Sequence, residues 1–285
     1  MTNTLLTLRK KIPETLTEIL HSVFDISAEL DIQTFVIGAI ARDLIFEYVY
    51  EAKIRRATED IDFGVAVGSW AEYEQLRESL IATGKFKDDK AGQRLWWKSG
   101  ADKMKIDLVP YGGLESAEGE IAFPPDEDFV MNTNGFAEAF GNSIFLEIEK
   151  DFTVRIASLA GLALLKFIAY NDRPYARKRD VQDIWFIAQN YLEAGNEERL
   201  YEENTDLLDD DFDYRTCGAR LLGRDISPLL NQETKEIILQ ILSDEKDIGR
   251  LQKFADVIYQ DGLQDEDNYN QILEVLRQLR LGITE

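Results

Sequence analysis

The sequence predicts an α/β domain followed by a helical domain, and three observations support this fold class. Up to about residue 155, short runs of β-branched and aromatic residues alternate with segments whose apolar residues recur at helical spacing. After Arg155 the pattern becomes mostly helical. Hydrophobic residues make up 45% of the 285 residues and aromatic residues 11%, which is enough for a core and unlike a disordered chain. We therefore expect one domain over residues 1–155 and a second over residues 156–285.

The individual elements follow from the spacing of apolar residues. In the first domain, helices are predicted over 14–31, from residue 39, and over 70–80, where Ser69 suits a helix N-cap. Strands are predicted over 34–37, 61–67, 94–98 and 104–109, the last ended by Pro110, with one or two more in 141–153. In the second domain, helices are predicted over 158–170, 181–192, 233–242, 251–259 and 269–279.

The charge and the rare residue types exclude several classes of function. The chain has 32 Lys and Arg against 54 Asp and Glu, and the net charge of −22 opposes non-specific binding to DNA or RNA. One cysteine, Cys217, and one histidine, His21, exclude zinc sites built from several thiolates or imidazoles. We therefore expect any chemistry to depend on carboxylates, Lys, Arg and hard cations.

No segment has the features of a secretion signal or a membrane span. The N-terminal residues lack a long apolar stretch, and no segment approaches the roughly 18 apolar residues that a spanning helix needs. We expect a cytoplasmic protein with no membrane partner.

Asp60 and Asp62 lie two residues apart in a predicted strand. Alternate strand residues project from the same face, so the two carboxylates are expected to point together while Ile61 and Phe63 enter the core. Two carboxylates held together repel each other, and a cation between them, above all Mg²⁺, relieves the repulsion. Two aspartates in a solvated turn are an equally good explanation of this segment alone.

A third carboxylate, Asp107, favours the interpretation that a cation binds at this strand over that of a solvated turn. It lies in an apolar strand, where a lone aspartate is disfavoured by propensity. If this strand neighbours the first, three carboxylates converge and can hold two cations roughly 3.5–4 Å apart. The alternative is that Asp107 forms an ion pair with Lys105 or a nearby arginine.

A candidate phosphate-binding turn precedes the aspartates. The predicted strand 34–37 runs through Gly38 and Ala39 into a helix. Glycine allows a ligand to approach the backbone closely, and the first turn of a helix presents N–H groups to phosphate. Arg42 lies in this turn, where its guanidinium can clamp a triphosphate.

Taken together, these segments resemble the DNA polymerase β-like nucleotidyltransferase superfamily. The resemblance rests on Gly38-Ala39, on Asp60-Ile61-Asp62-Phe63 and on Ile106-Asp107-Leu108. The Gly38 turn also resembles that of tRNA CCA-adding enzymes. Over roughly residues 35–190 the sequence is most similar to the AbiEii-like toxin nucleotidyltransferases of type IV toxin–antitoxin systems, and residues 195–285 resemble no family. One departure is Ala39, which stands where the superfamily more often has Ser or a second Gly.

The resemblance implies a polymerase β-like nucleotidyltransferase head, a mixed sheet with flanking helices, over residues 1–155. It implies that Asp60, Asp62 and Asp107 are catalytic and bind two Mg²⁺ ions. Gly38, Ala39 and Arg42 are then expected to bind the nucleotide.

In the helical domain, Lys166 and Asp180 match a lysine and a later acidic stretch of the AbiEii-like group. Lys166 lies in an otherwise apolar helix, and a lysine is almost never buried without a partner. The resemblance implies that Lys166 and Asp180 bind the nucleotide. The alternatives are that Lys166 extends to the surface, or that Asp180 or Asp183 is its partner.

The expected reaction moves a nucleoside monophosphate from an NTP to an acceptor hydroxyl. The sequence leaves open whether the acceptor is tRNA, another RNA or a protein, and the resemblance implies a cognate antitoxin. Two alternatives remain: a catalytically weak module of the same fold that binds nucleotide or docks an antitoxin, and an enzyme of the tRNA CCA-adding type.

Overall fold

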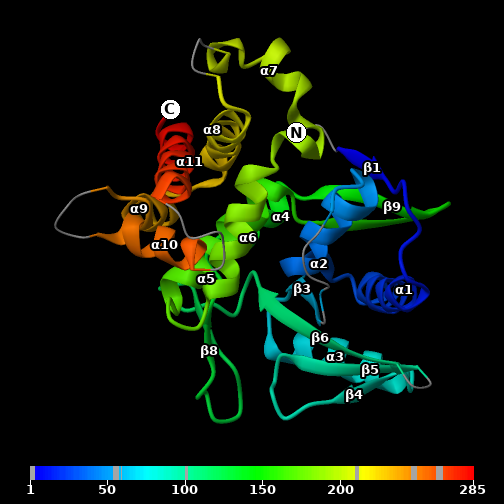
Figure 1. Ribbon diagram of the computed structural model, residues 1–285. Helices are drawn as coiled ribbons and strands as arrows, with labels where there is room; N and C mark the ends of the chain where they lie inside the picture. The colour runs from blue at the N-terminus through cyan, green and yellow to red at the C-terminus, as the bar shows by residue number, and fades with distance from the viewer. Residues whose placement is uncertain are drawn as a thin grey trace. The chain divides into compact units, whose positions relative to one another are not determined.

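The computed structural model describes residues 4–53, 58, 60–99, 102–208, 212–244, 249–260 and 266–285 (Figure 1). The chain divides into two compact units, Met1–Ser158 and Leu159–Glu285. The first contains a mixed sheet with flanking helices and the second is built from helices, so the predicted fold class is confirmed. Within the described residues, no helix is long and apolar enough to cross a membrane.

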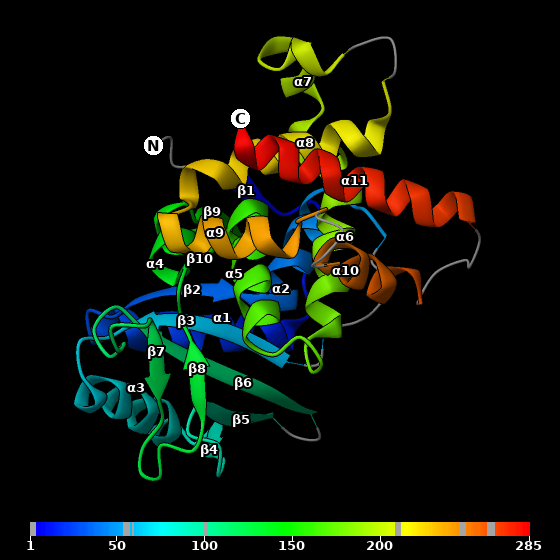
Figure 2. The ribbon, with the colours of Figure 1, turned by 90° about the vertical axis from the view of Figure 1, so that its left-hand side faces the viewer.

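The first unit is built on an eight-stranded mixed sheet with the order β1-β9-β10-β2-β3-β6-β5-β4. Figure 2 shows β2, β3, β6, β5 and β4 side by side in this order. Strand β3 is central, antiparallel to β2 and parallel to β6. The strands are β1 (Leu5–Thr7), β2 (Gln33–Ile37), β3 (Asp60–Ala66), β4 (Phe86–Asp88), β5 (Arg94–Ser99), β6 (Asp102–Tyr111), β9 (Ile144–Glu149) and β10 (Phe152–Ile156), with a separate hairpin of β7 (Glu120–Ala122) and β8 (Val130–Asn132).

Four helical segments accompany the sheet. They are α1 (Glu14–Glu29), α2 (Gly38–Asp43) with its π-helical continuation η1 (Leu44–Val49), α3 (Trp70–Ala82) and α4 (Phe136–Gly141). The predicted N-cap of α3 is confirmed, because the Ser69 hydroxyl accepts a hydrogen bond of 3.3 Å from the backbone N–H of Glu72.

The central strands have one apolar and one polar face. Ile61 and Phe63 are 1% and 0% exposed, and the Phe63 ring contacts Phe24 of α1 with ring centres 6.2 Å apart. In the neighbouring strand, Ile106 and Leu108 are both fully buried. Because side chains alternate along a strand, the residues between these project from the opposite face.

The prediction that Pro110 ends its strand is wrong, because β6 continues to Tyr111. The N–H of Leu108 donates to the Gln93 carbonyl, which is on the β5 side. Backbone N–H groups alternate in direction, so the nitrogen of Pro110 faces the same side, where the pairing with β5 has already ended at Arg94 and Asp107. A proline is tolerated at this point because no hydrogen bond of the sheet is lost.

Among its described residues, the second unit contains the five helices that the sequence predicts and two that it does not. The helices are α5 (Leu159–Asp172), α6 (Lys178–Gln189), α7 (Glu198–Glu202), α8 (Tyr214–Ile226), α9 (Gln232–Ile241), α10 (Arg250–Tyr259) and α11 (Glu266–Thr284), with short turns η2 (Leu192–Asn196), η3 (Thr205–Leu207) and η4 (Ser227–Leu229). The two unpredicted helices are α7 and α8.

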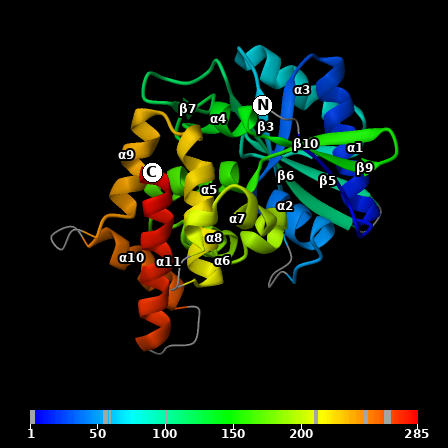
Figure 3. The same ribbon diagram turned by 90° about the horizontal axis from the view of Figure 1, so that it is seen from above.

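Helices α8 and α11 lie side by side at very close range (Figure 3). A Cβ atom added at Gly223 of α8 would lie 2.3 Å from the Leu279 carbonyl oxygen, and one added at Gly282 of α11 would lie 2.0 Å from the Arg220 carbonyl oxygen. Both glycines are therefore required for this backbone-to-backbone packing.

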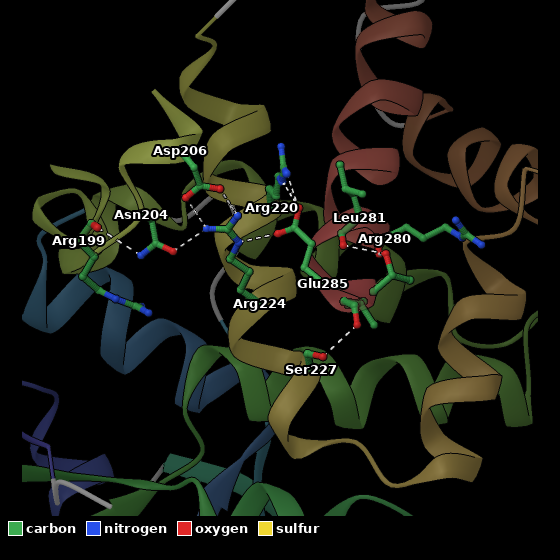
Figure 4. Close-up of polar contacts among 11 residues, drawn as sticks. Arg199, Asn204, Asp206, Arg220, Arg224, Ser227, Arg280, Leu281 and Glu285 are labelled. Atoms are coloured by element: carbon green, nitrogen blue, oxygen red, sulfur yellow. Dashed lines mark hydrogen bonds and ion pairs between the residues drawn. The ribbon is translucent and has the colours of Figure 1, made fainter. Parts of the chain in front are cut away.

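Polar contacts close the end of this helix pair (Figure 4). Arg224 Nε donates to Glu285 Oε2 at 2.6 Å, and its Nη1 donates to Asn204 Oδ1 at 2.8 Å. The Ser227 hydroxyl donates to the Ile283 carbonyl at 2.9 Å. These contacts fasten the C-terminal end of α11 to α8 and η4, and they fasten α8 to the segment before it.

Candidate active site

The register of β3 and β6 gathers the three predicted catalytic aspartates on the polar face of the sheet. Asp62 is the direct partner of Asp107, and Asp60 is the partner of Lys105. Direct partners point to the same face, and so do alternate residues of one strand. Asp60, Asp62 and Asp107 therefore share the face opposite the one that buries Ile61 and Phe63.

Arg94 of the adjacent strand holds the carboxylate of Asp107. Its Nε donates to Oδ1 at 2.8 Å and its Nη2 donates to Oδ2 at 2.7 Å, a bidentate pair. The side chains are 29% and 15% exposed. The hydrogen bonds to Asp107 raise the pKa of Arg94 despite its partial burial. This is the ion pair with a nearby arginine that the sequence left open.

The turn at Gly38 closes tightly over Asp62. Gly38 has a φ of +70°, in the left-handed region, and its neighbour Ile37 pairs with Asp62. A Cβ atom at Gly38 would lie 2.1 Å from Asp62 Oδ2. Both the backbone conformation and the space at this position therefore require glycine.

Arg42 lies in the same turn, and its buried guanidinium is hydrogen-bonded to the neighbouring Asp43. Its Nε and Nη2 both donate to Asp43 Oδ1, at 2.8 and 2.5 Å, and the Thr58 hydroxyl donates to Asp43 Oδ2. Arg42 and Asp43 are 7% and 2% exposed. Ala39 is half-buried at the start of α2. The nucleotide-binding roles of Arg42, Ala39 and Gly38 stay predictions.

The donor set on the polar face suits a hard cation, because it consists of carboxylate oxygens. In the conformation described, however, no group of three or more His, Cys, Asp or Glu is placed to hold a metal ion within the described residues. The bidentate pair with Arg94 commits both oxygens of Asp107. Each oxygen of the carboxylate keeps a second lone pair, so a cation that binds Asp107 either shares the carboxylate with Arg94 or displaces Arg94. The two expected Mg²⁺ ions stay a prediction.

In the helical unit, Lys166 is buried with two carboxylates. Its Nζ lies 2.5 Å from Asp183 Oδ2 and 3.1 Å from Asp180 Oδ1. Burial alone would lower the pKa of Lys166, but the negative charges of Asp183 and Asp180 outweigh it and raise the pKa above the ordinary 10.5. Lys166 is 6% exposed, so it does not extend to the surface. The nucleotide-binding roles of Lys166 and Asp180 stay predictions.

Sequence reasoning did not single out Arg94, although a signal was present. In the predicted strand, Leu95 and Trp97 are apolar while Arg94, Trp96 and Lys98 occupy the alternate positions. This alternation places the second set on the polar face. Only the register with β6 identifies Asp107 as the partner of Arg94.

A family model described as "Nucleotidyl transferase AbiEii toxin, Type IV TA system" matches residues 48–271, which is more than half of the chain. The chain belongs to this family. The resemblance seen in the sequence is confirmed, and the protein is a nucleotidyltransferase of the AbiEii family. The matched range includes all three aspartates of the polar face and Lys166, and it begins after the Gly38 turn.

Comparison with solved structures gives matches of low sequence identity and low TM-score. An antigenic nucleotidyltransferase-like protein from Paracoccidioides brasiliensis has a TM-score of 0.41 and 14% identity, over 70% of this chain and 92% of that one. JHP933 from Helicobacter pylori has a TM-score of 0.40 and 14% identity, over 96% and 94%. ANT(2")-Ia in complex with adenylyl-2"-tobramycin has a TM-score of 0.38 and 14% identity, over 68% and 99%. Comparison with curated proteins gave no match.

Proposed function

We propose that this AbiEii-family protein transfers a nucleoside monophosphate from an NTP to an acceptor hydroxyl in a Mg²⁺-dependent reaction. The observation that carries the proposal is the direct pairing of Asp62 with Asp107, with Asp60 on the same face. Three carboxylates on adjacent parallel strands, beside a glycine turn, suit a metal-bound triphosphate.

Each residue has a distinct proposed role. Asp60 and Asp62 hold the cation and through it the phosphates, and Asp107 orients the attacking hydroxyl once Arg94 releases it. Mg²⁺, when bound, neutralises charge on the phosphates and lowers the pKa of the attacking hydroxyl. Gly38 allows the backbone to approach both Asp62 and the phosphates. Catalysis then consists of alignment and charge neutralisation.

One observation favours a second candidate, a module that binds nucleotide with little catalysis. The pairing of Arg94 with Asp107 engages the third carboxylate. If Arg94 never releases it, Asp60 and Asp62 can hold one cation and a nucleotide without activating a hydroxyl. Nucleotide binding without pyrophosphate release would identify this module. An enzyme of the CCA-adding type is the less favoured alternative, because the net charge of −22 opposes bulk tRNA binding.

The family is that of type IV toxin–antitoxin systems, so we include a cognate antitoxin among the proposed partners. The acceptor on this proposal is an RNA, such as tRNA, or a protein. No role of a membrane is part of the proposal.

The test is transfer of label from each of the four NTPs, labelled at the α-phosphate, with Mg²⁺ and total RNA or total protein as acceptor. We expect one or more NTPs to label one acceptor class, and the label to be lost with Asp62→Asn. Asp128→Asn, a change of the same chemistry at an exposed loop position, is the matched control. Absence of transfer in every combination, or equal transfer by the two variants, would contradict the proposal.

A further inference from the structure

The polar face of the sheet continues beyond the aspartates along β5 and β6. In the antiparallel register of these strands, Arg94 pairs with Asp107, Trp96 with Lys105, and Lys98 with Lys103. Lys87 of β4 pairs with Trp96 and so joins the same face. We call the set that follows Arg94 and Asp107 the basic strip. It consists of Lys87, Trp96, Lys98, Lys103 and Lys105.

The basic strip is accessible and rich in positive charge. Lys87, Lys98 and Lys103 are exposed, and Lys105 and Trp96 are half-buried. Within the part of the chain that the structure describes, no ion pair joins any of these four lysines to a carboxylate. In a protein with a net charge of −22, such a local concentration of positive charge on one face attracts anionic ligands to this face.

Trp96 is fixed in the middle of the strip. Its Nε1 donates to Asp89 Oδ2 at 2.5 Å, which sets the orientation of the indole. The ammonium of Lys103 lies 3.5 Å from a Trp96 ring centre, and that of Lys105 lies 5.9 Å away. Lys103 therefore covers one face of the ring, and a base stacks on the indole either on the other face or in place of this ammonium. Proteins bind single-stranded nucleic acid by stacking bases on aromatic rings while positive groups neutralise the phosphates.

We propose that the basic strip binds the single-stranded end of a nucleic-acid acceptor. This inference rests on the proposed nucleotidyl transfer, for which it supplies the acceptor class and its path. The phosphates lie on Lys98, Lys103 and Lys105, a base lies against Trp96, and the terminal hydroxyl reaches Asp107.

The dimensions agree with this path. Alternate residues of a strand are about 6.6–6.8 Å apart, so Lys103 lies about 13 Å from Asp107 along β6. This length accommodates a short stretch of single strand and not a large duplex surface, which is consistent with the acidity of the rest of the protein. An acidic peptide would also bind the lysines, but its carboxylate side chains do not stack on an indole as a base does.

The experiment measures binding of a fluorescently labelled, mixed-sequence RNA of eight nucleotides by anisotropy, with Mg²⁺ and without NTP so that no transfer occurs. The test variant is Lys98→Glu/Lys103→Glu. The control is Lys10→Glu/Lys150→Glu, which changes the net charge equally at exposed positions of the same unit. Strands β2 and β3 separate β10 and β9, which Lys150 connects, from the strip. A polyglutamate peptide with the same number of charges is the second probe.

We expect wild type and the control to bind RNA alike, and the strip variant to bind about tenfold or more weakly. The dependence of log affinity on log salt should become shallower by about 1.4, because two phosphate contacts of a single strand are lost. Trp96→Ala should weaken binding by about tenfold, through lost stacking. Thermal unfolding of each variant verifies that it is folded.

Three outcomes would overturn the inference: no binding of RNA by wild type, equal weakening by the strip and control variants, or polyglutamate binding as tightly as RNA. The last result would assign the strip to an acidic protein segment. None of these outcomes bears on whether an NTP is used. If label transfer depends on Asp62 while the strip variant binds RNA as tightly as the control, the strip proposal fails and the proposed function stands.

Discussion

Each of the two units contains a basic side chain paired with carboxylate, and the two clusters differ in how readily a partner can be exchanged. On the sheet, Arg94 pairs with Asp107 where the two side chains are 29% and 15% exposed. Among the helices, Lys166 joins Asp180 and Asp183 where the side chains are 8%, 15% and 12% exposed. The first cluster has two more carboxylates beside it on the same face, and the second lies inside a packed helix pair.

The difference in exposure indicates that the Arg94–Asp107 pair is exchangeable and that the Lys166 cluster is structural. The pair on the sheet is bidentate and therefore stronger than most surface pairs, but it is partly exposed, so water or a metal ion can replace one partner at a lower cost than in a buried pair. A buried cation that loses its anions, or buried anions that lose their cation, cost several kcal/mol. Changes on the sheet face should therefore affect activity, and changes at Lys166 should affect stability.

The largest expected effect is on the sheet face. Asp62→Asn removes a negative charge without changing volume, and transfer should fall by about 10³-fold, since a charged metal ligand is lost. The midpoint of urea unfolding should stay close to that of wild type. Initial rates of label transfer and urea unfolding measure the two effects. Near-normal transfer by Asp62→Asn would remove the sheet face from the mechanism.

The next effect is at Lys166. Lys166→Met removes the ammonium that Asp180 and Asp183 share and leaves Asp180 with Arg177 at 3.7 Å, and we expect the free energy of unfolding to fall by about 3–5 kcal/mol. Lys178→Met, an exposed change on α6, should stay within about 0.5 kcal/mol of wild type. Urea unfolding measures both. An unchanged or increased stability of Lys166→Met would show that the carboxylates do not depend on the lysine.

The pH dependence of this cluster follows from the raised pKa of Lys166. A folded-state pKa above the ordinary 10.5 stabilises the folded protein at all pH values below 10.5, and this contribution is lost only as the pH rises through the higher folded-state value. The stability difference between wild type and Lys166→Met should therefore persist at pH 9 and decrease in strong alkali. A difference that disappears between pH 7 and pH 9 would contradict the raised pKa.

A smaller effect is expected from Gly38→Ala, which removes no functional group. The added Cβ would lie 2.1 Å from Asp62 Oδ2, so the carboxylate must move, and transfer should fall by about 10²-fold. Gly84→Ala is a matched control, because Gly84 has a φ of +77° with nothing within 4 Å of the added Cβ. Both changes should cost about 1–2 kcal/mol of stability from the left-handed backbone. Equal transfer rates in the two variants would show that the close approach to Asp62 is not needed.

The smallest effect concerns Arg94. Arg94→Gln frees Asp107 for a cation, so binding of Mn²⁺ in the absence of nucleotide should tighten by about tenfold, with a stability loss of about 1 kcal/mol or less. Asp107→Asn should weaken Mn²⁺ binding instead. Titration of Mn²⁺, followed by electron paramagnetic resonance, distinguishes the two. Unchanged Mn²⁺ affinity in both variants would mean that Asp107 is not a ligand.

Much of the fold could be predicted because local patterns and tertiary packing agree. The Ser69 cap and the apolar–polar alternation around Asp62 both act over a few residues, and the structure retains both. Helix α8 was not predicted, because Gly218 and Gly223 lower its intrinsic helix propensity. Its stability comes from packing against α11 at a distance that only glycine allows, and no local pattern shows this.

In the candidate site, too, local patterns predict what lies within one strand and not what tertiary packing adds. The spacing of Asp60 and Asp62 identified two carboxylates on one face, since strand geometry alone dictates it. The partners of Asp107 and Lys166 depend on register and helix packing, so the sequence could only offer alternatives. In both places the structure shows a carboxylate–cation pair, with Arg94 and with Asp180 and Asp183.

The most direct test of nucleotidyl transfer by the sheet face determines which product carries each of two labels. Wild-type protein is incubated with Mg²⁺, acceptor and the active NTP, labelled either at the α-phosphate or at the γ-phosphate. We expect the α label to appear on the acceptor and the γ label to leave as pyrophosphate, and we expect Asp62→Asn to abolish both. Appearance of the γ label on the acceptor, or retention of both labels in intact NTP, would contradict nucleotidyl transfer by this face of the sheet.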